Sequence, residues 1–134
     1  MFLNDFDQLL SAAHQQDQPQ RLLFVFVRAE LPDAPTDTQR QRHASRVGGT
    51  LTPVLCVDKL PGEIADFDAL ARESAATGQS WDLVFVAALD GRDGRAPAAE
   101  AADPHLRGMV QAIGQGQVSR YAAFDPHGDP VRFY

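Results

Sequence analysis

The stretch RLLFVFVRA, residues 21–29, decides the fold of this chain. Six consecutive apolar residues, rich in valine and phenylalanine, are typical of a strand covered by helices on both faces. A second strand of the same kind is predicted in WDLVFVAALDGRDGRAP, residues 81–97. A third is predicted in TLTPVLCVDKL, residues 50–60, where Pro53 has no N–H to donate. Pro53 should therefore lie at the beginning of its strand or at a sheet edge.

Helical patterns alternate with these apolar runs. Phe2, Phe6 and Leu10 recur at helical spacing near the N-terminus, and residues 36–45 could form a short exposed helix. The clearest helices are PGEIADFDALARESAATG, residues 61–78, and DPHLRGMVQAIGQG, residues 103–116. In the second of these helices, we expect Asp103 as N-cap and Pro104 as first helical residue. The last segment, residues 118–134, predicts a hairpin whose turn contains Pro126, Gly128 and Pro130.

Strands that alternate with helices favour an α/β fold. We therefore expect a single α/β domain over residues 1–134, with a mixed, mainly parallel sheet of four or five strands flanked by helices. Its crossovers should be right-handed, and a C-terminal antiparallel hairpin should close the sheet. A chain of 134 residues has the ordinary size of one domain and can bury a core without disulfides.

Composition excludes several classes of function. The net charge of −6 disfavours general nucleic-acid binding. A single cysteine, Cys56, cannot form an intramolecular disulfide, and this usage favours a reducing compartment. The first twenty residues lack the pattern of a signal peptide, and no apolar run approaches the roughly 20 residues that cross a bilayer. We expect a cytoplasmic protein with no membrane partner.

Charged residues follow each of the three predicted strands. If the strands are parallel, their carboxyl ends meet on one rim of the sheet, where open α/β sheets bind ligands. The alternative is that these charges only mark where each strand reaches water. The predicted ligand-binding rim consists of Arg28, Asp58, Lys59, Asp90, Arg92 and Arg95.

The Gly91–Arg95 loop is the most distinctive part of this rim. Arg92 and Arg95 each follow a glycine and could clamp a carboxylate or phosphate. Pro97 removes one backbone donor, however, and neither the GK[ST] nor the G-x-G-x-x-G nucleotide motif is present. The alternative interpretation is a flexible connection that carries solvated charges.

No metal or cofactor is expected. The four histidines are far apart in sequence, and none has a second ligand at the spacing of a zinc site. Cys56 could be activated by the nearby Lys59, but strand alternation places the two side chains on opposite faces. We interpret Cys56 as a small buried apolar residue. The histidines are His14, His43, His105 and His127.

The segments RLLFVFVRAELPD, LCVDK, WDLVFVAALDGRDGRAP and FDPHGDPVRF resemble a family of small proteobacterial proteins of unassigned function. The likeness covers nearly the whole chain. Members are sometimes labelled as the α subunit of ribonucleotide reductase, which implies radical chemistry on nucleotides. Such subunits are several times longer and need a radical cysteine with a further cysteine pair, whereas this chain has Cys56 alone. The resemblance therefore implies a compact bacterial domain and transfers no catalytic residue.

Three functions remain open from the sequence. The leading hypothesis is a module that binds a small anionic ligand or a protein partner at the rim near the Gly91–Arg95 loop. A second is an enzyme acting on a small anionic or nucleotide-like substrate, with Asp58 or Asp90 as base and Arg92 or Arg95 as clamp. A third is an accessory subunit that associates with itself or another protein through its first helix or its terminal hairpin.

Overall fold

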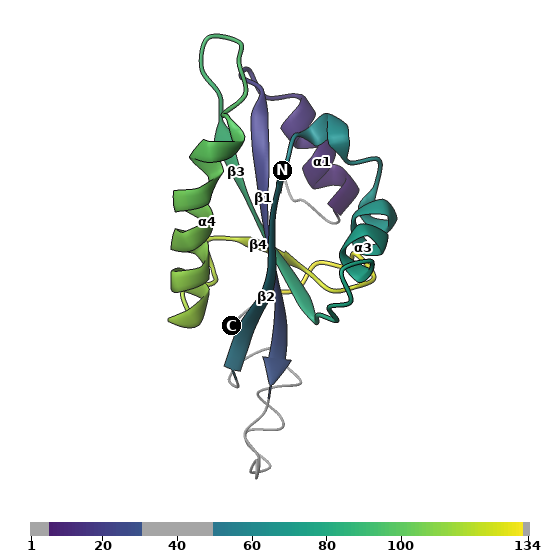
Figure 1. Ribbon diagram of the computed structural model, residues 1–134. Coiled ribbons are helices and arrows are strands. Elements are labelled where there is room, and N and C mark those ends of the chain that lie inside the picture. Colours follow the sequence, from purple (N-terminus) through teal and green to yellow (C-terminus); the bar gives the residue numbers. More distant parts are fainter. Residues whose placement is uncertain (1–5, 31–49, 133–134) are drawn as a thin grey trace.

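The computed structural model describes residues 6–30 and 50–132, which form a four-stranded sheet with helices on both faces (Figure 1). The strand order is β2-β1-β3-β4, and every neighbouring pair is antiparallel. The strands are β1 (Gln20–Glu30), β2 (Thr50–Lys59), β3 (Leu83–Asp90) and β4 (Ala122–Phe124). The helices are α1 (Phe6–His14), α3 (Phe67–Ala75) and α4 (Ala99–Gly114), with a short 3-10 helix η1 (Pro61–Glu63).

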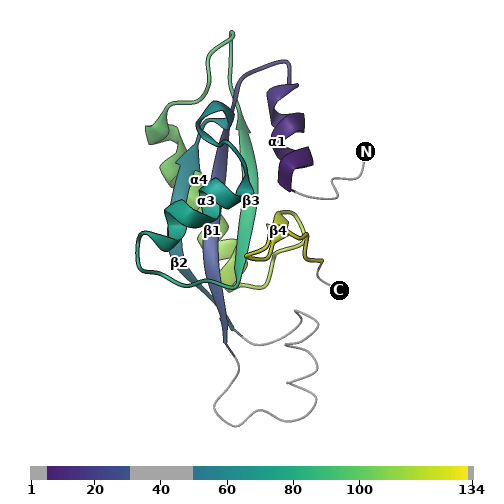
Figure 2. The same ribbon diagram turned by 90° about the vertical axis from the view of Figure 1, so that its right-hand side faces the viewer.

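The helices divide between the two faces of the sheet. Figure 2 shows α1 and α3 in front of the strands, with α4 behind them. Alternation along β1 serves both layers, because Phe24 and Phe26 point toward α1 and α3 while Leu23 and Val25 point toward α4. The chain thus buries two separate apolar cores, one on each side of a single sheet.

The prediction of a mainly parallel sheet is wrong. β1 lies between β2 and β3 and runs antiparallel to both. The continuous apolar run at residues 22–27 led to the error, because such runs are usual in parallel sheets. What the run requires is a cover on both faces, and here α1 and α3 on one side and α4 on the other provide it for antiparallel strands. Strand direction does not enter that requirement.

Aromatic side chains hold the α1 and α3 face together. Phe6 is buried and makes edge-to-face contacts with Phe67 at 5.2 Å and with Phe124 at 5.6 Å between ring centroids. Such ring pairs stabilise by about 0.5–1.5 kcal/mol beyond the area they bury. Trp81 packs on Phe26, and its indole N–H donates to Ser74 Oγ at 2.9 Å, which satisfies this buried hydroxyl.

Both helices that were predicted most clearly begin elsewhere. The segment expected as one helix from Pro61 is broken into η1 and α3, and Asp66 caps α3 by accepting from the N–H of Ala69 at 2.8 Å. Helix α4 begins at Ala99, so Pro104 lies inside the helix instead of at its first position. The alanine-rich segment before Asp103 has high helix propensity and extends the helix backward.

Other predictions agree with the structure or lie outside it. Pro53 is on β2, an edge strand, as expected. At the C-terminus, the chain turns back after β4, and one bridge joins Phe124 to Pro130. The helix considered at residues 36–45 and the start of the first helix before Phe6 lie outside the described residues. Among the helices that are described, none combines the length and apolar character needed to span a membrane.

Candidate binding groove between β2 and α4

A groove of about 470 Å³ runs between the edge strand β2 and helix α4. Cys56 and Asp58, two residues apart on β2, form one wall because alternate strand residues share a face. The other wall is a single stripe of α4 with the spacing i, i+3, i+4, i+7 and i+8. The residues of this α4 stripe are Asp103, Leu106, Arg107, Val110 and Gln111.

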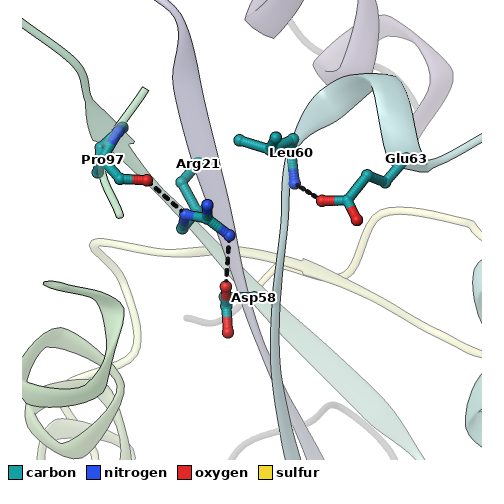
Figure 3. A network of polar contacts seen from close by, with 5 residues as sticks. All are labelled: Arg21, Asp58, Leu60, Glu63 and Pro97. Atoms are coloured by element: carbon teal, nitrogen blue, oxygen red, sulfur yellow. Dashed lines mark hydrogen bonds and ion pairs between the residues drawn. The ribbon is translucent and has the colours of Figure 1, made fainter. Parts of the chain in front are cut away.

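Asp58, in the β2 wall of the groove, forms an ion pair with Arg21. Arg21 on β1 donates from Nη1 to Asp58 Oδ2 at 2.6 Å and from Nε to the carbonyl oxygen of Pro97 at 2.7 Å (Figure 3). The two charged side chains are largely shielded, with 14% of Arg21 and 25% of Asp58 exposed. Through these contacts, Arg21 ties the end of β2 to the segment that leads into α4. We call these contacts of Arg21 with Asp58 and Pro97 the Arg21 clasp. Next to the Arg21 clasp, Glu63 accepts from the N–H of Leu60 at 2.8 Å.

The groove has charges of opposite sign along its length. Asp103 lies near the start of α4, one helical turn before Arg107, and both residues are exposed. Neither side chain makes a hydrogen bond or an ion pair with any other residue in the described part of the chain. Leu106 and Val110, which also line the groove, supply apolar surface beside them. The groove can therefore accept a group that combines an apolar stem with a charged end.

Cys56 differs from its prediction, because it is exposed in the groove and not buried. It belongs to β2, which is the edge strand of the described sheet. Desolvation by partial burial still raises the pKa of the Cys56 thiol. A raised pKa keeps the thiol protonated at neutral pH, so this environment does not favour a nucleophilic role.

The structure separates most residues of the predicted rim. Arg28 lies at the opposite end of the sheet from Asp58 and donates to the carbonyl oxygen of Ser80 at 3.2 Å. Lys59 is on the α3 face, where it pairs with Glu73 at 2.7 Å. The antiparallel order turns the end of β1, with Arg28, away from the ends of β2 and β3. Strand alternation directs Lys59 to the face opposite Asp58.

Asp90 also lies apart from Asp58. The two carboxylates belong to β3 and β2, which flank β1 and end on the same side of the sheet. Their registers place them on opposite faces, since Asp90 pairs with Gln20 and Asp58 pairs with Leu23. Asp90 accepts from the Gln20 side-chain amide at 2.7 Å. A shared site built on both carboxylates is therefore not formed.

The Gly91–Arg95 loop is a tight turn. Arg92 and Arg95 exchange two backbone hydrogen bonds of 2.9 Å, and the two residues between them, Asp93 and Gly94, have φ values of 54° and 76°. Positive φ at both central positions is typical of a type I′ turn. A Cβ atom on Gly91 would collide with the carbonyl oxygens of Arg95 and Pro19. The glycines are thus explained by turn geometry and close packing.

The arginines of this turn do not form the expected clamp with the other rim residues. Arg92 and Arg95 are exposed, and their side chains form no hydrogen bond or ion pair with the residues that the structure describes. They also lie outside the lining of the β2–α4 groove. The loop contributes to that groove only indirectly, because Pro97 follows it and receives the hydrogen bond from Arg21.

Of the residues that line the groove, only Asp58 was predicted from the sequence as a ligand-binding residue. The charged lining residues Asp103 and Arg107 were missed, and so was Arg21, the ion-pair partner of Asp58. Asp103 was assigned to helix capping, and Arg21 was treated as the residue before an apolar run. The available signal was the α4 stripe, in which polar residues border the apolar face at helical spacing. The sequence does not show which strand this stripe faces, because that depends on strand order.

Comparisons with known proteins add no assignment. A scan against protein-family models, a search of curated proteins and a search of solved structures found no match to this chain. The resemblance to small proteobacterial proteins therefore stays a prediction. Within residues 6–30 and 50–132, no group of three or more His, Cys, Asp or Glu side chains is arranged to hold a metal ion.

Proposed function

We propose that this protein is a binding module whose working site is the groove between β2 and α4. The observation that carries the proposal is the α4 stripe, on which Asp103 and Arg107 are exposed one helical turn apart beside Leu106 and Val110. Unpaired charges of opposite sign next to apolar surface are the polar groups that orient a ligand in a concave site. The proposal keeps the expected class of function and moves its site away from the Gly91–Arg95 loop.

The Arg21 contacts beside Asp58 support the same assignment. Arg21 holds Asp58 and the segment before α4 together, so the two walls of the groove keep a fixed separation near Asp58. Sites whose walls are fixed before binding lose less entropy when a ligand is bound. The partner class that suits these walls is an amphipathic ligand or a segment of another protein, and not a polyanion.

The test is an NMR titration of the full chain against short peptides and small amphipathic ions of both signs. We expect changes in backbone amide chemical shifts that are confined to β2 and α4. The same titration of Arg107→Ala should show no such changes. Arg72→Ala removes another exposed arginine, on α3, and this variant should bind as the native protein does. Shifts that gather elsewhere, or binding by Arg107→Ala that matches the Arg72→Ala control, would show that the groove is not the site.

A further inference from the structure

We propose that the occupant of this groove is an extended segment of another protein, which adds to the sheet as a fifth strand along the outer edge of β2. This inference rests on the proposed function and specifies its partner. Strand addition uses the backbone groups of an open edge for affinity and pockets for alternate side chains for specificity. Both elements are present at β2.

The first argument is the free edge itself. β2 is the outermost strand, and no strand in the described part of the chain pairs with its outer side. Figure 1 looks directly at this edge, with α4 on one side of β2 and α3 on the other. An edge strand directs alternate N–H and C=O groups outward, and these groups can hydrogen-bond to an added strand. The five residues of Leu55–Lys59 pair regularly with β1, so this part of the edge is straight enough to be extended.

The second argument is that grooves lie on both faces of the same strand. Cys56 and Asp58 line the groove toward α4, and the intervening residues Leu55, Val57 and Lys59 line a smaller hollow of about 60 Å³ toward α3. An added strand would send its side chains alternately to these two sides. The unequal volumes require long side chains toward α4 and short ones toward α3.

The third argument is charge. Arg21 links Asp58 to Pro97, just before α4, so the Asp58 end of the groove is also the Asp103 end. Two carboxylates therefore gather there, and Arg107 lies one turn further along the helix. Four helical residues span about 6 Å, and two strand residues span about 6.7 Å. A basic and an acidic side chain two residues apart on the added strand would meet the two charges in that order.

A second copy of this chain fits the edge less well. The first half of β2 is irregular, because Pro53 lacks a donor and Val54 is unpaired at a bulge. If two copies paired antiparallel along the whole of β2, this irregular half of each copy would lie against the regular half of the other. Proline and bulges at an edge oppose such self-association. Two chains of net charge −6 also repel each other, whereas a partner that brings a basic side chain does not.

The experiment is selection from a phage-displayed library of random peptides of about eight residues, a length that covers one strand. The native full chain and the variants Arg107→Glu and Asp103→Lys are used, and circular dichroism checks that these exposed substitutions preserve the fold. We expect selected peptides with a basic and an acidic residue two positions apart. Arg107→Glu should lower the affinity for a synthetic copy of the best peptide by about tenfold or more. Selection against this variant should give peptides with a basic residue at the position that is acidic in peptides selected by the native protein.

N-methylation of that synthetic peptide tests the strand directly. Methyl groups on the alternate amides that face β2 should abolish binding, whereas methyl groups on the intervening amides should change it little. If no peptide is enriched, or if methylation acts equally at every position, the partner is not an added strand. A protein that sediments as a dimer and protects its β2 edge without peptide would identify a second copy as the occupant and overturn the inference.

These outcomes separate the two proposals. In one outcome, small amphipathic ions shift the β2 and α4 amide signals, Arg107→Ala abolishes these shifts, and the peptide selection fails. This outcome would support the groove as the binding site and exclude an added strand as its occupant. Selected peptides that bind but shift residues away from β2 and α4 would remove both.

Discussion

The two edges of the sheet are finished in different ways. β4 has three residues, and the chain turns back over its outer side, where Val131 N–H donates to the carbonyl oxygen of Ala123 at 2.9 Å. β2 has ten residues, and its outer side is unpaired within the described ranges. A long open edge is a template for another strand. Within the described residues, the fold therefore covers the β4 edge and leaves the β2 edge unpaired.

β2 is protected in one half only. Pro53 and the bulge at Val54 interrupt the beginning of the edge, and the regular part follows from Leu55 to Lys59. The grooves on both faces are lined from this regular part. The part of the edge that can still be extended is therefore the part with side-chain sites beside it.

The largest difference between the edges should appear in stability. Phe124 on β4 is 2% exposed and packs against Phe6, whereas Leu55 on β2 is half-buried. Phe124→Ala should lower the free energy of unfolding by about 3–5 kcal/mol, and Leu55→Ala by about 1–2 kcal/mol. Urea denaturation of both variants measures the two losses. Equal losses would mean that the β2 edge is as firmly integrated in the core as β4.

The Arg21 clasp should have the next largest effect. Arg21→Ala leaves Asp58 partly buried without its partner and should cost about 1–3 kcal/mol of unfolding free energy. Asp58→Ala and the double variant complete a thermodynamic cycle, in which the double variant should lose less than the sum of the two single variants. Lys59→Ala is the comparison on the other face, where the partner Glu73 is 58% exposed. Strict additivity of Arg21→Ala and Asp58→Ala would exclude an energetic clasp.

Hydrogen exchange should distinguish the edges amide by amide. The N–H groups of Asp125 and Val131, which accompany the turn after β4, are hydrogen-bonded to Asp129 and Ala123. Every second amide of Leu55–Lys59 faces outward and should exchange at least about tenfold faster than these two, because it lacks a partner strand. Exchange measured by NMR on the full chain tests this. Uniform protection along β2 would show that its edge is already covered.

The smallest effect concerns Cys56. Its pKa is raised by desolvation, so at a given pH below the pKa the folded protein holds less thiolate than the unfolded chain does. The rate of alkylation by iodoacetamide should therefore rise at higher pH in the folded protein than in the same protein in urea. The difference should disappear once both thiols are deprotonated. Coincident rate profiles would mean that the groove does not desolvate the sulfur.

Much of the local structure could be predicted from particular residues. Strands are found at all three apolar runs, because β-branched and aromatic residues favour strands. The missing donor of Pro53 predicted a position at the beginning of a strand or at a sheet edge, and Pro53 lies on the edge strand β2. The start of α4 was misplaced, because an N-cap and a proline at residues 103 and 104 were weighed above the alanine-rich segment before them.

The candidate site was less predictable. Asp58 was named from the sequence and does line the groove, but Arg28, Lys59 and Asp90 are directed to other parts of the sheet. Arg28 was placed in the rim on the expectation of parallel strands. Lys59 and Asp90 do end on the same side as Asp58, but they lie on the opposite face of the sheet. Arg107 was missed because nothing in an exposed helical arginine indicates which strand will lie opposite.

The sequence by itself determined which segments of the chain become strands and that the main strands are covered on both faces. Apolar periodicity is a local property, and each segment carries its own pattern. Only the tertiary structure decided the order β2-β1-β3-β4, the direction of each strand and the pairing of β2 with the polar stripe of α4. These relations join residues far apart in the chain, and burial alone does not distinguish a parallel neighbour from an antiparallel one.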